Sequence, residues 1–209
     1  MAAVNDKNLP TLYTVGHSTH EADAFINLLR GHGIKMIADV RSSPYSRMTP
    51  QFDREALMAL LRRSDIQYVF MGQELGARRT EAECYENAKA RYDLIARAPL
   101  FLAGLQQIRQ TAGRLRMALL CAEKDPITCH RAILVCRHLR QDRLAIRHIL
   151  SNGSLESQAE AENRMLDTHD LSGGHLFESQ EQLIERAYDI QGDKIAYEKD
   201  QSETGADFR

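Results

Sequence analysis

The sequence has little of what marks a secreted, membrane-bound or strongly basic protein. Its 27 basic and 29 acidic side chains give a formal charge of −2, so net charge does not imply binding to nucleic acid or to a membrane. No apolar run approaches the ~20 residues of a membrane span, and the first residues lack the apolar region of a signal peptide. The four cysteines have no spacing that indicates a disulfide framework. We therefore expect a cytoplasmic protein with reduced thiols.

Apolar residues alternate between strand-like and helix-like spacing along the chain. Short apolar runs predict strands at residues 11–15, 34–40, 67–71, 115–120 and 144–149. Helical spacing predicts helices at about residues 21–30, 54–63, 100–110 and 126–140. This alternation is typical of a single doubly wound α/β domain, Rossmann-like or flavodoxin-like, with a mainly parallel sheet of about five strands.

The length is that of one domain with a sizeable core. We expect an N-terminal extension at residues 1–10, the α/β domain at residues 11–198 and a disordered tail at residues 199–209. A helical appendage begins at about residue 151, with helices predicted at 154–165 and 178–190. The last helix has an apolar face that packs on the domain or on a second copy, which would make a homo-oligomer. The charge-rich segment 72–97 is expected to be a mobile, partly helical insertion.

The segment from Cys121 to Arg131 concentrates reactive side chains where an apolar strand runs into a helix. Asp125 is a good N-cap and Pro126 a good first helical residue, so the loop should end at a helix N-terminus. Such a terminus favours a thiolate or a bound anion, which makes Cys121 the first candidate nucleophile. Cys129 belongs either to this site or to the apolar face of the helix.

The other two cysteines are expected to have no part in this chemistry. Cys136 falls on the apolar face of the predicted helix and should lie in the core. Cys84 stands among acidic residues, which disfavour a thiolate.

Side chains that carry chemistry also follow other predicted strands. Ligands of parallel α/β sheets bind beyond the carboxyl ends of the strands, so these side chains should surround one crevice. They are His17 and Ser18, Asp39 and Arg41, Cys121 and Glu123, His130 and Arg131, and His148. Structural alternatives exist for several of them, since a serine here can cap a helix and an aspartate two residues from an arginine can form a buried ion pair.

These motifs together resemble domain-of-unknown-function family 488. The resemblance is carried by Thr14-Val-Gly16-His17-Ser18, Asp39-Val-Arg41-Ser-Ser-Pro44, Cys121-Ala-Glu123-Lys-Asp-Pro126 with Cys129-His130-Arg131, and His148-Ile-Leu. With Leu183-Ile-Glu-Arg-Ala-Tyr188-Asp-Ile-Gln191 and Lys194-Ile-Ala-Tyr197 it extends over roughly residues 11–198. The resemblance implies the α/β fold and singles out these residues, but it implies no reaction. The chain departs from it at Leu75-Gly76-Ala77-Arg78, where a more glycine-rich turn is expected.

Three hypotheses about function remain open. In the first, the protein is a thiol-dependent enzyme for a phosphate-bearing small molecule or nucleotide. Cys121 is then the nucleophile, His17 or His130 the acid or base, Asp39 an orienting group, and Arg131 the anion-binding residue. Arg41, Ser18, Glu123 and His148 are the remaining candidates for substrate binding.

In the second hypothesis, Cys121, Cys129 and a histidine, from among His17, His130 and His148, bind a divalent metal such as zinc or iron. In the third, the crevice binds a nucleotide or a nucleic-acid end without catalysis, through arginines such as Arg41 and Arg78.

Overall fold

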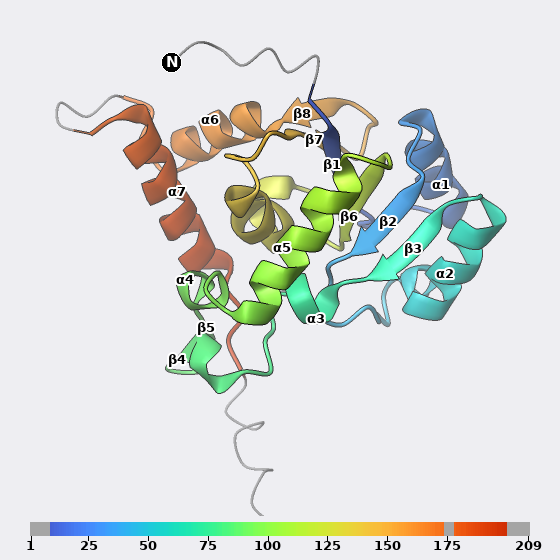
Figure 1. The fold of residues 1–209 in the computed structure, drawn as a ribbon, viewed down its shortest axis with the longest axis horizontal. Coiled ribbons are helices and arrows are strands. Elements are labelled where there is room, and N and C mark those ends of the chain that lie inside the picture. The colour runs from blue at the N-terminus through green and yellow to red at the C-terminus, as the bar shows by residue number, and fades with distance from the viewer. Residues whose placement is uncertain (1–8, 174–177, 200–209) are drawn as a thin grey trace, which may run out of the picture.

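The computed structural model describes residues 9–173 and 178–199, and its centre is a sheet with the strand order β3-β2-β6-β1-β7-β8. The strands are β1 (Thr11–Gly16), β2 (Met36–Asp39), β3 (Gln67–Phe70), β6 (Met117–Cys121), β7 (Ala145–Ile149) and β8 (Leu155–Ser157). The first five are parallel, and β8 pairs antiparallel with β7 (Figure 1). The predicted doubly wound sheet is therefore confirmed. The strand β8 was not predicted, because residues 154–165 were assigned wholly to a helix.

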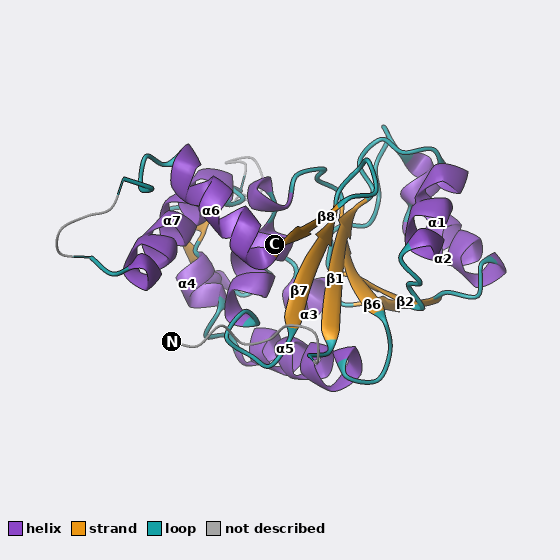
Figure 2. Cartoon of the chain, turned by 90° about the horizontal axis from the view of Figure 1, so that it is seen from above, coloured by secondary structure: helices purple, strands orange, loops and turns teal. Residues whose placement is uncertain are grey.

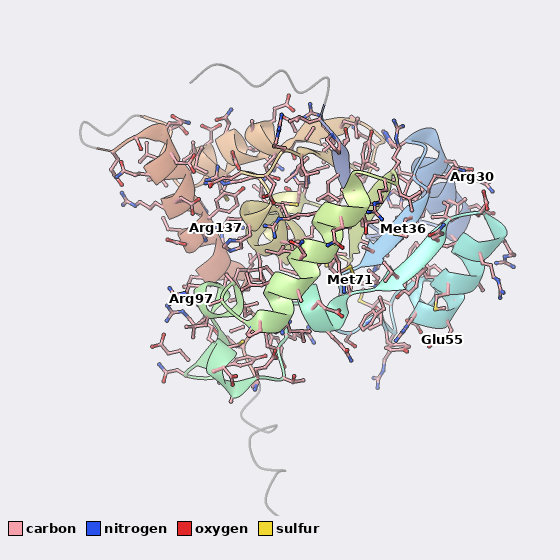
Figure 3. The ribbon with its side chains drawn as sticks, viewed as in Figure 1. Arg30, Met36, Glu55, Met71, Arg97 and Arg137 are labelled. Atoms are coloured by element: carbon pink, nitrogen blue, oxygen red, sulfur yellow. The ribbon has the colours of Figure 1, made fainter. Side chains whose placement is uncertain are left out.

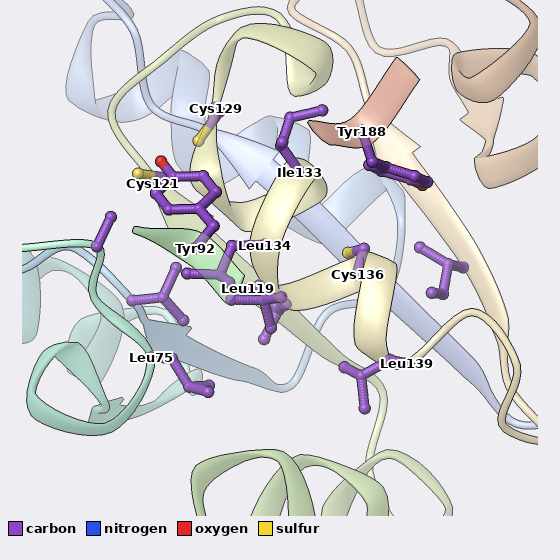
Figure 4. Packing of buried hydrophobic residues seen from close by; sticks show 14 of the residues in the cluster. Leu75, Tyr92, Leu119, Cys121, Cys129, Ile133, Leu134, Cys136, Leu139 and Tyr188 are labelled. Atoms are coloured by element: carbon purple, nitrogen blue, oxygen red, sulfur yellow. The ribbon is translucent and has the colours of Figure 1, made fainter. Parts of the chain in front are cut away.

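Helices cover both faces of the sheet (Figure 2). On one face lie α1 (Ala22–Gly31) and α2 (Arg54–Arg63); on the other lie α5 (Pro99–Ala112), α6 (Gln158–Thr168) and α7 (Gln180–Ile195). Each face of the sheet carries a cluster of buried apolar residues. Side chains alternate along a strand, so Leu12 of β1 belongs to the larger cluster and Tyr13 to the smaller one on the opposite face. Cys136, as predicted, is completely buried in the larger cluster, part of which is drawn in Figure 4.

Residues 72–97, predicted as a mobile insertion, pack against the domain. They form α3 (Gly72–Leu75), a 3-10 turn η3 (Ala82–Cys84), a hairpin of β4 (Tyr85–Glu86) and β5 (Lys89–Ala90), and α4 (Tyr92–Ile95). Leu75, Cys84 and Ile95 are at most 1% exposed and belong to the larger core cluster, so this segment is part of the domain core.

The two C-terminal helices also belong to that core. Both begin with a capping box, in which Ser157 pairs with Glu160 and Ser179 pairs with Gln182. Arg137, labelled in Figure 3, lies 2.5 Å from Glu185 of α7 in an ion pair. The apolar face of α7 packs on its own domain. Formation of a homo-oligomer through this helix stays a prediction. No helix in the described part of the chain is long and apolar enough to cross a membrane.

The predicted helix at residues 126–140 is broken into three pieces. Asp125 caps the 3-10 turn η4 (Pro126–Thr128) as expected, by accepting a hydrogen bond from the Ile127 amide. Cys129 then adopts extended backbone angles, φ −134° and ψ 137°, before a π-type turn η5 (Arg131–Val135) and a 3-10 turn η6 (Cys136–His138). The prediction of a continuous helix was therefore wrong at Cys129. π-type turns occur frequently at functional sites.

Candidate functional site

A cavity of about 320 Å³ lies beyond the carboxyl ends of β2 and β6, where the strand-end rule places a ligand. Its wall comes from the loops after β2, α3 and β6, from α4, and from the segment after α7. Its lining residues include Arg41, Ser43, Arg78, Tyr92, Cys121, Glu123, His130 and Tyr197. Two larger hollows, about 480 and 810 Å³, lie between α4 and α7 and beside α2, away from the reactive motifs.

Four reactive groups lie close together beside this cavity. The side chains of Cys121, Glu123, Cys129 and His130 each place a donor atom so that all four atoms lie within 4.8 Å of one another. The Cys121 sulfur lies 3.6 Å from Nδ1 of His130, and the Cys129 sulfur lies 3.0 Å from a Glu123 carboxylate oxygen. The expected proximity of the two cysteines is confirmed. We refer to these four residues as the thiol cluster.

Gly16 allows the cluster loop to lie against β1. The amides of His17 and Ser18 donate to the carbonyls of Cys121 and Ala122 at 3.0 and 2.9 Å, so pairing between β1 and β6 continues into the loops. A Cβ atom on Gly16 would lie 1.8 Å from the Glu123 carbonyl oxygen. Only glycine therefore fits at this position. Ser18 itself takes a left-handed conformation, φ 47°, and acts through its backbone amide.

The break at Cys129 turns its sulfur back toward the cluster. The Arg131 amide donates to that sulfur at 3.4 Å, and the amides of Ala132 and Ile133 donate to the Cys129 carbonyl. Cys129 thus lies just before the second helical segment, and its sulfur accepts a hydrogen bond from the first amide of that segment, as a capping oxygen would. A helix N-terminus stabilises negative charge at this atom.

The surroundings of His130 determine which of its ring nitrogens faces the cluster. Its Nε2 lies 2.9 Å from the Val40 carbonyl oxygen, which can only accept, so Nε2 carries a proton. Burial acts to lower the pKa of His130, but a hydrogen bond with Cys129 and the negative charge of Cys129 and Glu123 outweigh it and raise the pKa. In its neutral form the ring presents the lone pair of Nδ1 to Cys121. Lone pairs of this kind serve equally as a general base or as a metal ligand.

The two neighbouring thiols differ in acidity. Burial raises the pKa of the Cys121 thiol, and negative charge at Cys129 and Glu123 raises it further. At Cys129 burial also acts to raise the pKa, but a hydrogen bond from Cys121 and the positive charge of Arg131 and His130 outweigh it and lower the pKa below its ordinary value. These shifts favour Cys129 over Cys121 as the site of the first thiolate, whereas the sequence favours Cys121.

Arg131 points away from the cavity and is completely buried. Its guanidinium donates to the carbonyls of Glu123 at 2.7 Å and Lys124 at 3.3 Å, and to the Thr14 hydroxyl at 3.3 Å. The anion-binding role expected for Arg131 has no support in this arrangement, since its donors already hold the cluster loop. Its role here is to position the backbone of Glu123.

His17, Asp39 and Arg41 form a second polar group beneath the cavity. Arg41 makes a two-pronged ion pair with the buried Asp39, at 2.9 and 2.6 Å, and Tyr68 donates to the same carboxylate. His17 donates from Nδ1 to the Ser18 carbonyl and accepts at Nε2 from Arg41, while its ring stacks on Phe52. Burial lowers the pKa of His17 to about 4, so the ring is neutral at pH 7. Of these three residues only Arg41 lines the cavity.

His148 lies outside the site. It pairs along the sheet with Thr14, whose hydroxyl it contacts at 2.8 Å, and its other nitrogen lies 3.0 Å from the Gln158 side-chain oxygen. Burial lowers its pKa to about 3. The single crevice expected from the strand-end rule thus receives Arg41, Cys121, Glu123 and His130, but not His148 or Arg131.

Tyr92 is a site residue that the sequence did not indicate. It begins α4, within the segment expected to be an insertion, and its hydroxyl end lies next to Cys121 and Cys129 (Figure 4). Burial, and then the negative charge of the two cysteines and Glu123, raises the pKa of this hydroxyl. A protonated hydroxyl can donate to a ligand bound at the cluster. Tyr92 is bordered by charged residues on both sides, a pattern that gives no signal of burial.

Fold and cluster together define a class of protein: a doubly wound α/β domain with cysteine, histidine and carboxylate side chains gathered at the carboxyl edge of its sheet. Within that class, the chain belongs to the family "Domain of unknown function DUF488", whose model matches residues 21–137. This match covers more than half of the chain and includes both the Asp39 and Cys121 motifs. No curated protein and no solved structure matches the chain. The family expected from the motifs is confirmed, and it assigns no reaction.

Proposed function

We propose that this protein binds a zinc ion through Cys121, Cys129 and His130 and uses it in hydrolytic chemistry on a small molecule in the adjoining cavity. The observation that carries the proposal is the gathering of two sulfurs, an imidazole nitrogen and a carboxylate oxygen within 4.8 Å of one another. Thiolate and imidazole are the donors that zinc prefers, and tetrahedral coordination at ~2.0–2.3 Å needs donors this close together.

The groups around the cluster support this assignment. Metal-binding histidines usually donate their second nitrogen to a carbonyl or carboxylate, as His130 does to Val40. The Arg131 amide bonds the Cys129 sulfur, and the buried Arg131 guanidinium adds a positive charge nearby. Metal binding would keep both thiols ionised, whereas without a cation the negative charge at Cys129 opposes ionisation of Cys121.

Glu123 differs from the other three residues of the cluster in being exposed as a whole, and it lines the cavity together with Cys121 and His130. Three protein ligands with an open fourth position are typical of catalytic zinc sites, in which the metal lowers the pKa of bound water to ~7. We assign the open position to the cavity side and Glu123 to proton transfer from that water. Tyr92, whose pKa is raised, stays protonated and donates to the substrate.

A thiol-dependent enzyme is the second candidate, favoured by one specific contact. Cys121 lines the cavity and lies 3.6 Å from Nδ1 of His130, the nitrogen that carries the lone pair in the neutral ring, which is the arrangement of a nucleophile beside its base. The raised pKa of Cys121 weighs against it, and the more acidic Cys129 is only 1% exposed. The two candidates make opposite predictions about metal.

The experiment is metal analysis of protein purified without chelator. The zinc proposal predicts equimolar zinc, with most of it lost in Cys121→Ser, Cys129→Ser and His130→Gln. Cys84→Ala is the matched control, since Cys84 is equally buried but outside the cluster, and it should keep its zinc. Protein that contains no zinc, and does not take it up when zinc is added, would exclude the proposal and leave the thiol enzyme.

A further inference from the structure

The cavity wall carries positive charge as well as the thiol cluster. Two arginines line it, Arg41 and Arg78. Arg41 is neutralised by Asp39 and donates further hydrogen bonds to His17 and the Phe52 carbonyl. Arg78 is exposed, and within the described residues no carboxylate forms an ion pair with it. Arg78 therefore provides the positive charge that is available to a ligand.

Arg78 is also held in place before any ligand arrives. Its amide donates to the Ser42 hydroxyl at 2.9 Å, which ties the loop after α3 to the loop after β2. Gly76 makes that approach feasible, because a Cβ there would lie 2.5 Å from the same hydroxyl oxygen. The guanidinium carbon sits 4.5 Å above the centre of the Tyr197 ring. Stacking fixes the plane of the group and leaves its N–H edges able to donate.

Tyr197 in turn is fixed by the hairpin that follows η3. The Ala90 amide donates to the Tyr197 carbonyl at 2.8 Å, and Lys199 pairs in the same way with Ala88. The segment after α7 thus forms part of the cavity wall, with the ring of Tyr197 as the support for Arg78.

We infer that the substrate is a small molecule with a phosphate or carboxylate group, which Arg78 binds while the reacting part of the molecule faces the thiol cluster. The second half of this inference rests on the proposed function; the anion site at Arg78 does not. A planar guanidinium matches either oxyanion with two parallel hydrogen bonds. The hydroxyl of Ser43 lies on the same wall, and a cavity of about 320 Å³ fits a molecule of this size.

Opposite charges on the cavity wall would fix the direction of binding. Glu123 and the two thiols repel an anion, while Arg78 attracts it. The sequence predicts a phosphate-bearing substrate bound by Arg131. With the donors of Arg131 occupied by the loop, Arg78 takes over the role of binding the phosphate.

The test uses phenyl phosphate and benzoate as anionic probes and phenol as the neutral probe, titrated calorimetrically into zinc-loaded and chelator-treated protein. We expect at least one anion to bind both forms, and phenol to bind neither. Arg78→Gln should weaken anion binding roughly tenfold or more, and Arg78→Lys should restore part of it. Arg47→Gln is the matched control, because Arg47 is exposed on the loop after β2 but does not line the cavity.

Each outcome decides one question. Anion binding that depends on Arg78 in both forms supports the site, whether or not zinc proves to be native, and the tighter probe identifies phosphate or carboxylate. Binding that disappears with chelator and is unchanged in Arg78→Gln places the anion on the metal; it would overturn the Arg78 site and leave the zinc proposal intact. Absence of anion binding to both forms would also overturn it.

Discussion

The Nε2–H group of His130 donates to the carbonyl of Val40 at 2.9 Å, across a separation of 90 residues in the chain. This bond joins the end of β2 to the helical segment after β6. It orients the ring so that Nδ1 faces the cysteines, and it excludes Nε2 from ligand binding. One backbone carbonyl thus determines what His130 can do at the cluster.

Zinc should protect two of the four cysteines from alkylation. In chelator-treated protein we expect N-ethylmaleimide to modify Cys121, which lines the cavity, and Cys129, whose pKa is lowered, before Cys136, which is completely buried in the core. Adding zinc should slow modification of the first two thiols and leave the rates at Cys84 and Cys136 unchanged. Peptide mass spectrometry measures all four rates together. Equal rates with and without zinc would mean that the thiols are not ligands.

Replacing Gly16 should damage both the fold and the cluster. In Gly16→Ala the new methyl group would overlap the Glu123 carbonyl, and we expect a loss of about 3 kcal/mol in the free energy of unfolding. Gly31→Ala is the matched control, because nothing lies within 4 Å of the added atom at the end of α1. Urea unfolding compares the two variants. A Gly16→Ala variant as stable as Gly31→Ala would show that the loop does not lie against β1.

Arg131 should be needed for the loop, not for binding an anion. Arg131→Met would leave the carbonyls of Glu123 and Lys124 without their buried donor, and we expect a loss of about 3 kcal/mol in stability. Zinc affinity should fall roughly tenfold, as for other residues that support ligands. Competition with a chromophoric chelator measures that affinity. Unchanged zinc affinity together with weaker phenyl phosphate binding would restore the anion-binding role.

His148 should make the fold sensitive to acid. Its folded pKa is lowered to about 3, below the ordinary value of 6.5, so between these values only the unfolded chain binds the proton. Stability from this residue is therefore complete above pH 6.5 and falls as the pH decreases, by at most about 1.4 kcal/mol per pH unit. Urea unfolding of chelator-treated protein at pH 7, 6 and 5 measures the slope.

His148→Gln is the comparison for that series, because glutamine can still accept from Thr14 and donate to Gln158. The variant should lose about one proton of pH dependence between pH 6.5 and 4.5. His17, whose pKa is also lowered, is unchanged in both proteins and contributes equally. Identical slopes would show that His148 takes up a proton without unfolding.

The sequence was sufficient for the sheet and for the location of the site. Strand patterning and the strand-end rule placed Arg41, Cys121 and Glu123 around one cavity, because parallel strands with covering helices leave few arrangements. It was also sufficient to keep Cys136 in the core, where helical spacing is a direct signal of burial.

The direction of individual side chains could not be predicted in the same way. The break at Cys129 has no proline or glycine to announce it, so Arg131 was placed toward a ligand when it points into the loop. His148 was expected just past the carboxyl end of its strand, but it lies within β7, paired with β1 inside the sheet. Tyr92 is placed at the site by the conformation of residues 72–97. That conformation depends on contacts with residues distant in sequence, which sequence patterning does not reveal.

Cobalt substitution tests the central claim most directly. Equimolar cobalt(II) added to chelator-treated protein should give the intense thiolate-to-cobalt charge-transfer absorption and the d–d bands of a tetrahedral site. The charge-transfer band should fall by half or more in Cys129→Ser, which loses one thiolate and most of its metal affinity. It should persist in Cys84→Ala and in Glu123→Gln, since Glu123 is assigned to proton transfer. Cobalt spectra without a thiolate band, or with the same band in Cys129→Ser as in the unaltered protein, would contradict a metal centre built on these cysteines.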